Sequence, residues 1–345
     1  MRRRNALIAI LAFCLIAPLQ ACKPIQADLT PTPIREEESK QVNAISSANL
    51  GQITLLKTFA GHQGRVLDVV FSPDGELLAS SGRDRKIRLW QTSTGEELIS
   101  FQMHSVDLAD IDISPDGRLL ASGEAIWDLK EMQEIQILER GTIHPTSVAF
   151  SPDGTLLAVA RFDQGVEIWN PDSGEIIQSF EVGPDTRTKG MEFSPDGRLL
   201  AAGVIDGTIR IWEIRSGEIT DTLHYPGETD IHDLAYSADG RYLGAVGRLP
   251  RVMLWDTFSR ETISLPSFRD NANAVDFSPD SSLLAVSAGA ERSVFLYDLS
   301  SDSLSQTLPL SEQSLAMRFS PDGSYLATGL FDGQILLWGI STGQR

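Results

Sequence analysis

A five-residue phrase that returns seven times constrains the fold of this chain more than any other feature. It reads FSPDG at Phe71 and recurs as ISPDG, FSPDG twice, YSADG, FSPDS and FSPDG. Its serine stands at Ser72, Ser114, Ser151, Ser194, Ser237, Ser278 and Ser320, which gives a period of 37 to 43 residues. Pro and Asp followed by Gly favour a tight turn, so each copy predicts a turn between two short strands.

Apolar stretches surround the turns at similar distances. VLDVVF precedes the first turn and LLASS follows it, and a third stretch ends in Trp90. The other copies place an aromatic residue at nearly the same point: Trp127, Trp169, Trp212, Trp255, Tyr297 and Trp338. Phrases such as ELISF at 97–101 and EIIQSF at 175–180 add a fourth strand. Four short strands in each of seven units predict an all-β fold, a seven-bladed β-propeller.

The last unit lacks its fourth strand, because the chain stops soon after Trp338. The phrase QITLLKTF, residues 52–59, stands before the first full unit and matches the fourth-strand phrases. We expect this segment to pair with the strand that holds Trp338. The pairing would close the ring and remove an exposed strand edge that invites aggregation.

The period, the Gly61–His62 pair and the Trp-Asp pairs at Trp127 and Trp255 resemble the WD40 family over residues 52–345. The family closes its rings in the way expected here. The resemblance also implies a buried structural network of a loop His, a strand Ser or Thr, a turn Asp and the Trp. Blade one carries the full set, His62, Ser80, Asp84 and Trp90. Partial sets are His104, Ser122 and Trp127; Asp163 and Trp169; Asp206 and Trp212; and Thr328, Asp332 and Trp338.

The same resemblance implies that partners bind on the top face, around the mouth of the central channel. Three positions per blade project there, seven and five residues before the repeat Ser and seven before the repeat Trp. Their basic and large apolar members are the candidate partner-binding residues Arg65, Arg83, Phe162, Arg187, Lys189, Ile205, Arg248 and Phe331, against two acidic residues, Asp107 and Asp230. Arginines interleaved with aromatic residues are typical of protein-binding hot spots. The sequence therefore predicts a face that binds an acidic peptide or protein segment.

The N-terminus has the pattern of an export signal. Arg2, Arg3 and Arg4 precede an apolar stretch at 6–19 that is short for a membrane span. The phrase LQAC at 19–22 resembles the lipobox of bacterial lipoproteins, which implies cleavage after residue 21 and acylation of Cys22. An uncleaved anchor and ordinary secretory cleavage are the alternatives. Residues 22–51 are polar and contain proline, which predicts a flexible tether before a propeller at 52–345.

Charge restricts the partners of the mature chain. Removing residues 1–21 takes away three Arg and no acidic residue, so the formal charge moves from −18 to −21. Such a body is repelled by nucleic acids and by anionic lipid headgroups. We therefore expect protein partners and no nucleic acid, with membrane attachment supplied by the lipid on Cys22.

The leading hypothesis is a protein-interaction scaffold, lipid-anchored outside the cytoplasm of a bacterium, with no chemistry of its own and no cofactor. One alternative is an accessory lipoprotein of an envelope or outer-membrane assembly complex. Another is a hydrolase with a channel-bound calcium ion, for which Asp107, Asp230, Asn271 and Asn273 would supply oxygen ligands. His144, His224 and His232 fall in different units and predict no shared metal site. The hairpin after Ser122 is five residues short, which predicts a notch in the top rim.

Overall fold

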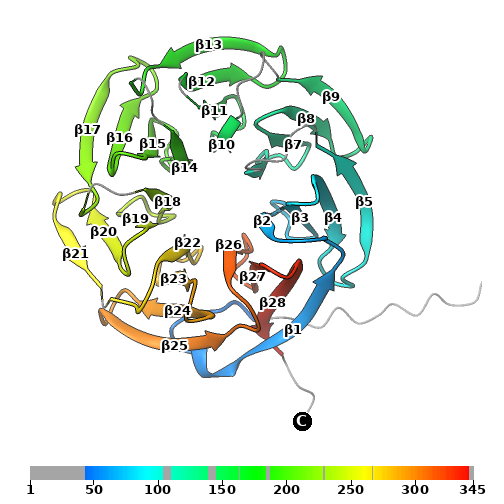
Figure 1. Cartoon of the computed structure of the whole chain (residues 1–345), viewed down its shortest axis with the longest axis vertical. Helices are drawn as coiled ribbons and strands as arrows, with labels where there is room; N and C mark the ends of the chain where they lie inside the picture. Colours follow the sequence, from blue (N-terminus) through cyan, green and yellow to red (C-terminus); the bar gives the residue numbers. More distant parts are fainter. Residues whose placement is uncertain are drawn as a thin grey trace, which may run out of the picture. The chain divides into compact units, whose positions relative to one another are not determined.

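The computed structural model describes residues 43–103, 110–138, 145–162, 164–183, 187–227, 230–265 and 267–341. Within these residues the strands form seven four-stranded antiparallel sheets, arranged as blades around a central channel (Figure 1). This confirms the predicted seven-bladed propeller. None of the described helices is long or apolar enough to cross a membrane.

Each blade runs from an inner strand at the channel to an outer strand at the periphery. Blades one to four consist of β2 (Val66–Phe71), β3 (Leu77–Gly82), β4 (Lys86–Gln91) and β5 (Glu97–Gln102); β6 (Ile111–Ile113), β7 (Leu119–Ser122), β8 (Ala125–Asp128) and β9 (Gln133–Ile137); β10 (Pro145–Phe150), β11 (Leu157–Arg161), β12 (Gly165–Asn170) and β13 (Glu175–Phe180); and β14 (Thr188–Phe193), β15 (Leu199–Val204), β16 (Thr208–Glu213) and β17 (Ile219–His224). Blades five to seven consist of β18 (Ile231–Tyr236), β19 (Tyr242–Gly247), β20 (Val252–Asp256) and β21 (Thr262–Ser264); β22 (Ala272–Phe277), β23 (Leu283–Ala288), β24 (Ser293–Asp298) and β25 (Ser303–Pro309); and β26 (Ser314–Phe319), β27 (Tyr325–Leu330), β28 (Gln334–Ile340) and β1 (Ile53–Ala60).

The repeated phrase forms the turn between the first and second strands of every blade. In the first copy the Ser72 hydroxyl donates to the Asp74 carboxylate at 2.5 Å, and Gly75 adopts the left-handed conformation with φ +71°. Blade six has Ser281 at the glycine position with φ +57°, and its hydroxyl accepts a hydrogen bond from the backbone N–H of Asp239. The contact between neighbouring turns compensates the strain of a non-glycine residue there.

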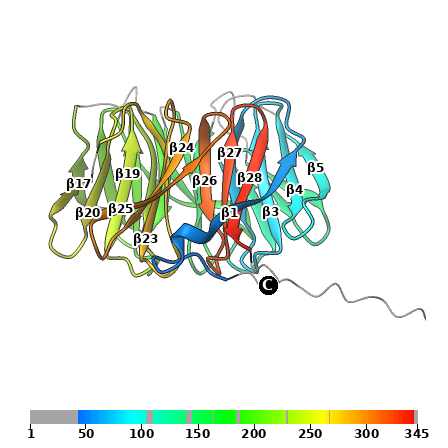
Figure 2. The ribbon, with the colours of Figure 1, turned by 90° about the horizontal axis from the view of Figure 1, so that it is seen from below.

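Strand β1 completes blade seven, as the sequence predicts. It pairs antiparallel with β28 from Ile53 opposite Ile340 to Ala60 opposite Gln334. The edge of the last sheet is thereby covered by a segment from the other end of the chain, and Figure 2 shows β1 crossing the outside of β28.

The predicted boundary of the propeller at Gln52 is too late. Ile45 and Leu50 are buried in an apolar cluster with residues of blades six and seven, and the N–H of Ile45 donates to the carbonyl of Gly323. A 3-10 helix, Leu50–Gln52, leads into β1. Residues 43–51 therefore belong to the folded body. Two isolated apolar residues carry no periodicity, which is why the sequence pattern favoured a coil there.

Apolar clusters between neighbouring blades make up the core. The repeat aromatic residues pack there against the outer strand of the preceding blade: the ring centroids of Phe59 and Trp90 are 5.7 Å apart, and those of Phe101 and Trp127 are also 5.7 Å apart. In blade two the hairpin between β7 and β8 is short, as predicted. Its Gly123 lies against Pro145, where an added Cβ would come within 2.0 Å of the proline ring.

Candidate functional site

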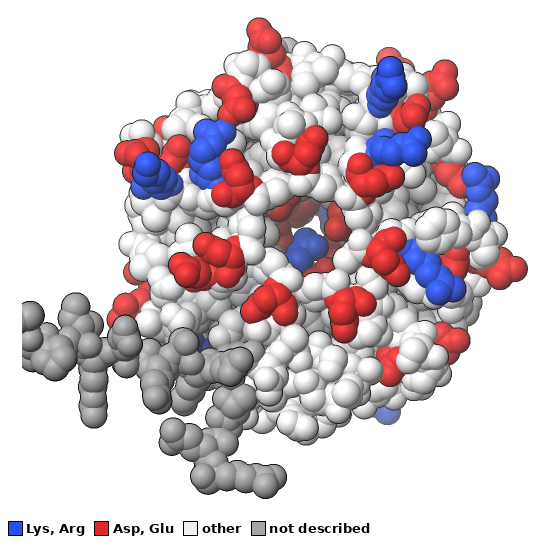
Figure 3. All heavy atoms as spheres, turned by 180° about the vertical axis from the view of Figure 1, so that it is seen from behind, with Lys and Arg blue, Asp and Glu red and all other residues white. Residues whose placement is uncertain are grey.

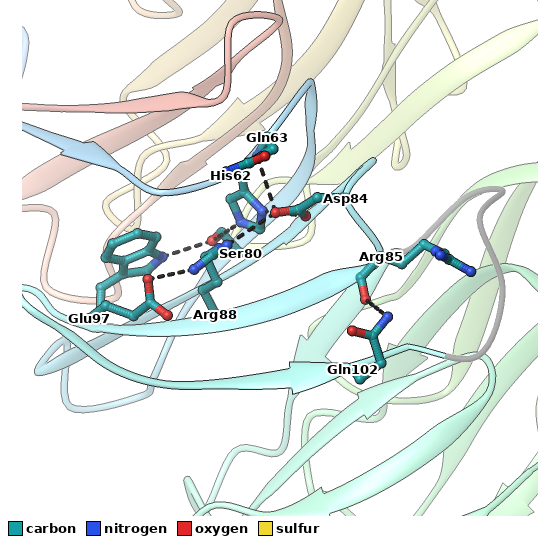
Figure 4. Close-up of polar contacts among 9 residues, drawn as sticks. His62, Gln63, Ser80, Asp84, Arg85, Arg88, Glu97 and Gln102 are labelled. Atoms are coloured by element: carbon teal, nitrogen blue, oxygen red, sulfur yellow. Dashed lines mark hydrogen bonds and ion pairs between the residues drawn. The ribbon is translucent and has the colours of Figure 1, made fainter.

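Blade one contains the complete polar network that the resemblance implied (Figure 4). His62 lies in the loop between β1 and β2, Ser80 on β3, Asp84 in the β3–β4 turn and Trp90 on β4. His62 Nδ1 is 2.9 Å from Asp84 Oδ1, His62 Nε2 is 2.8 Å from Ser80 Oγ, and the Trp90 indole N–H donates to Ser80 Oγ at 2.8 Å. Two residues that the sequence reasoning missed extend it: Arg88 pairs with Asp84 at 3.1 Å and with Glu97 at 2.6 Å.

The proton positions in this network follow from its partners. A carboxylate only accepts, so His62 Nδ1–H donates to Asp84, and Nε2 then accepts from the Ser80 hydroxyl. Burial lowers the pKa of His62, and the hydrogen bond and charge of Asp84 offset this lowering only in part. The imidazole ring is therefore neutral at pH 7. Asp, His and Ser are connected here as in a hydrolase triad, but Ser80 is 0% exposed and its oxygen is held by Trp90. The network therefore stabilises the blade.

In three other blades, different side-chain contacts stand where blade one has this network. In blade three the Trp169 indole donates to Glu167 at 3.2 Å, and Glu167 pairs with the buried Arg161 at 2.9 Å. In blade seven the Trp338 indole donates to Thr328 at 3.2 Å. In blade four Asp206 pairs with Arg210 at 3.4 Å. His104 and Asp163 lie outside the described residues.

The inner strands enclose a central channel with a cavity of about 590 Å³. Among the described residues, the carboxyl groups of Asp68, Asp110, Asp112, Glu192 and Asp233 line it. Several of them connect one blade to the next. Asp68 accepts from the N–H of Ile111 at 2.9 Å, and Asp112 accepts from the N–H of Phe150 at 2.7 Å. Equivalent bonds join Glu192 to Tyr236, Asp233 to Val275 and Asp276 to Phe319. These carboxyl groups therefore hold the ring together from inside.

Arg318 on β26 is the cation among these carboxyl groups. Its guanidinium is 3.7 Å from Asp276, and a third of its side chain (33%) remains exposed to the channel. Burial lowers the pKa of Arg318, but Asp276, Asp233, Asp68 and Glu192 outweigh that effect and raise it. Burial raises the pKa of Asp112 to about 6, of Asp233 to about 7 and of Glu192 to about 8. The channel thus holds more carboxyl groups than one arginine neutralises.

The top-face positions named from the sequence lie at one end of this channel, which we call the rim. In four blades the first and last of the three positions are joined by a backbone hydrogen bond: Arg83 to Arg65, Ile205 to Arg187, Arg248 to Asp230 and Phe331 to Gln313. The middle positions line the channel itself, at Leu67, Thr146, Lys189, His232, Asn273 and Leu315. Asp107 and His144 lie outside the described residues.

The structure divides the eight candidate rim residues into distinct local environments. The Arg65 guanidinium lies over the Phe331 ring at 4.0 Å, so Phe331 is only half-exposed and Arg65 joins blades one and seven. Arg83, Phe162 (44% exposed) and Ile205 (39% exposed) face solvent. Arg248 pairs with Asp230 at 3.2 Å. Basic and apolar side chains are thus distributed around one mouth of the channel and do not form a single cluster.

Lys189 and Arg187 stand apart, because within the described residues neither forms a salt bridge and both are half-buried. Burial lowers the pKa of Lys189, and Arg187 lowers it further. Burial and then the Lys189 charge lower the pKa of His232, whose Nδ1–H donates to the Ala272 carbonyl at 3.2 Å. Positive charge is therefore concentrated where blades four and five meet the channel mouth.

The opposite face, which we call the turn face, has the reverse charge. The turn aspartates Asp74, Asp116, Asp153, Asp196, Asp239, Asp280 and Asp322 are all exposed there. Figure 3 shows acidic side chains around the channel mouth on this face, with basic atoms inside the channel. Hydrogen bonds from the repeat serines lower the pKa of Asp74, Asp116, Asp153 and Asp196, which keeps them ionised. The turn aspartates therefore place negative charge around this mouth of the channel.

Two of the predicted calcium ligands have protein partners in the structure. Asp230 pairs with Arg248, and the Asn273 amide donates to the Ser314 carbonyl at 2.9 Å. In the described part of the chain no group of three or more His, Cys, Asp or Glu side chains could hold a metal ion. The sequence reasoning did not single out the channel carboxyl groups. Their signal was present, because apolar inner strands such as VLDVVF carry a carboxylate either four or two residues before the repeat Ser.

Comparison with known proteins finds WD40 repeats along this sequence. The family described as "WD domain, G-beta repeat" matches residues 53–91, 95–128, 135–170, 262–298 and 304–339, and the "Anaphase-promoting complex subunit 4 WD40 domain" matches residues 181–239. The chain is 29% identical over 142 residues to the small ribosomal subunit protein RACK1 of Brassica napus (35% of this chain, 43% of that protein). It is also 29% identical over 144 residues to the COMPASS component SWD3 of Saccharomyces cerevisiae (38% of this chain, 46% of that protein). The chain thus spans less than half the length of these relatives. Because the repeat pattern covers more than half of the sequence, the chain belongs to the WD40 repeat family.

Proposed function

We propose that this protein is a membrane-anchored, extracytoplasmic WD40 propeller that acts as a protein-interaction scaffold and binds an acidic protein segment on its rim. One observation carries the proposal: a chain of formal charge −18 presents Arg65, Arg83, Arg187, Lys189 and Arg248 around one channel mouth. Basic side chains gathered on one face of an acidic body attract acidic partners and orient them toward that face.

The apolar surroundings of the charges support a protein partner. Phe162 and Ile205 are exposed on the same rim, and Arg65 is already held flat on Phe331. An arginine fixed by an aromatic ring loses less side-chain entropy on binding, which favours it as a hot spot. The names of the relatives place RACK1 in the small ribosomal subunit and SWD3 in COMPASS, and such membership in assemblies supports a scaffold role here.

The point at which the chain enters the propeller supports the anchored arrangement. Asn43 bridges to Ile340, and Ile45 is bonded to Gly323 in the blade-seven turn, so the described chain begins at the turn face. The segment that follows an acylated Cys22 would therefore join the propeller on that face. Cys22 itself lies outside the described residues.

Charge reversal tests the rim. In-cell crosslinking should capture partners with the wild-type protein and lose them with Arg65→Glu combined with Arg187→Glu. The matched control is Lys130→Glu with Arg215→Glu, which changes the net charge equally at exposed turn positions between third and fourth strands. If the rim variant captures every partner as before, the rim is not the binding face.

Mass spectrometry tests the anchor separately. The mature N-terminal peptide is expected to begin at Cys22 and to carry acyl chains, and Cys22→Ala is expected to lose both the acyl mass and membrane retention. A mature N-terminus at any other residue would contradict the lipoprotein assignment.

A further inference from the structure

The channel mouth at the rim is chemically divided. Six described residues of its wall stand five positions before the repeat Ser, one in each blade except blade two. Blades three to six contribute Thr146, Lys189, His232 and Asn273, whereas blades one and seven contribute Leu67 and Leu315. One half of the mouth is therefore polar and contains a cation, and the other half is apolar.

Within the described residues no salt bridge joins Lys189 or Arg187 to an acidic side chain. Asp230 on the same rim pairs with Arg248 at 3.2 Å. Asp110 lies in the channel wall and attracts both Lys189 and Arg187, but no salt bridge joins it to either within the described residues. A half-buried ammonium beside a half-buried guanidinium is unfavourable unless an anion joins them.

We propose that this mouth binds a carboxylate of a partner chain between Lys189 and Arg187, with the apolar atoms beside the carboxylate resting on Leu67 and Leu315. This assignment rests on the proposed function, since it names the group through which an acidic segment engages the rim. Charge-assisted bonds from an ammonium and a guanidinium are the strongest hydrogen bonds available to a carboxylate.

The channel below limits how far the ligand enters. Asp68, Asp112 and Asp233 line the wall deeper along the inner strands, where burial already raises the pKa of each carboxyl group and therefore disfavours a further ionised carboxylate. The bound carboxylate therefore stays at the mouth, and a long acidic segment continues across the rim toward Arg65 and Arg83.

His232 distinguishes the two possible sources of the carboxylate. Its Nδ1–H donates to the Ala272 carbonyl, so in the neutral ring Nε2 is an acceptor. The C-terminal residue of a chain offers a carboxylate and, on the adjacent Cα, an amide N–H that suits this acceptor. An Asp or Glu side chain presents its carboxylate without that donor. The structure thus favours a chain terminus over an acidic side chain.

Three acetylated tripeptides test the proposal as probes: Ser-Gly-Leu with a free carboxylate, the same peptide amidated, and amidated Gly-Glu-Gly. Each peptide is titrated into the purified protein up to about 10 mM. This concentration is high enough to detect the weak binding expected of one charged contact. The readout is the methyl NMR signals of Leu67 and Leu315, assigned by single substitution. The free-carboxylate peptide is expected to shift both signals, and Lys189→Gln is expected to weaken its binding about tenfold.

Two further variants control for structural damage. Lys189→Arg keeps the charge and should retain binding, and Lys130→Gln removes the same charge from the exposed β8–β9 turn and should change nothing. Binding of the Glu peptide alone would assign the site to an acidic side chain. The carboxylate site is overturned if no peptide shifts the signals, or if Lys189→Gln binds as well as the wild type does. In that case loss of partners in the Arg65→Glu and Arg187→Glu variant would still uphold the rim as a binding face.

Discussion

Replacing Arg318 with Met should destabilise the propeller in a strongly pH-dependent way. At 3.7 Å from Asp276 and an effective dielectric constant of about 20, the attraction is about 4 kcal/mol. The cost of desolvating the pair and the water that reaches the exposed third of the Arg318 side chain reduce the net contribution to about 2 kcal/mol. We expect that loss in the free energy of unfolding at pH 8.

The sign of the pH dependence follows from the carboxyl groups. The pKa values of Asp112, Asp233 and Glu192 are raised to about 6, 7 and 8, so the folded protein binds these protons more tightly than the unfolded chain does. Their stabilising effect is fully present below about pH 4 and is lost as the pH rises through 6 to 8. At pH 5 these three groups are protonated, so removing Arg318 leaves fewer unpaired carboxylates and should cost less than it does at pH 8.

Urea unfolding of the wild type and of Arg318→Met at pH 5 and pH 8 measures both quantities. Adding Asp276→Asn should restore part of the stability at pH 8, because it removes the unpaired charge and keeps an acceptor for the N–H of Phe319. Arg198→Met, at an exposed position, is the control. An equal loss at both pH values, or a larger loss at pH 5, would refute the electrostatic account of the channel.

Three further predictions concern the ring and its turns. Ser80→Ala leaves the Trp90 N–H and His62 Nε2 without a partner and should lower the free energy of unfolding by about 2 kcal/mol, measured in urea. Phe59→Ala opens a cavity under β1 and should cost about 3–4 kcal/mol, whereas Thr58→Ala, exposed on the same strand, should be nearly neutral. Below about pH 4 the wild type should lose stability, because the turn aspartates with lowered pKa become protonated; a melting temperature that keeps rising toward pH 2 would contradict this.

The repeat allowed the fold and the residues of the rim to be predicted from the sequence alone. Because seven copies stand in register, the offset from the repeat Ser or Trp predicted which residues lie at the rim, and a backbone hydrogen bond joins Arg83 to Arg65 there. The outer strand missing after Trp338 predicted the pairing of β1 with β28, which the structure confirms. Periodicity carries this information because each unit repeats the same local structure.

Contacts that differ from blade to blade, or that form between blades, could not be predicted in this way. Arg161 and Glu167 replace the blade-one network by a different ion pair, and no positional rule specifies such a substitution. Ile45 packs against the blades through contacts that depend on the assembled ring. Lys189 was expected on the rim, but whether it faces solvent or the channel depends on the side chains of neighbouring blades. These features arise between units and have no signature within one unit.

The pairing of β1 with β28 also orders events during synthesis. The two strands are almost 300 residues apart in the sequence, so the ring cannot close until β28 has left the ribosome. Until then the nascent protein is an open row of blades, with a vacant place beside its last sheet. The blades made first therefore remain without a closed ring until the strand that pairs with β1 has been synthesised.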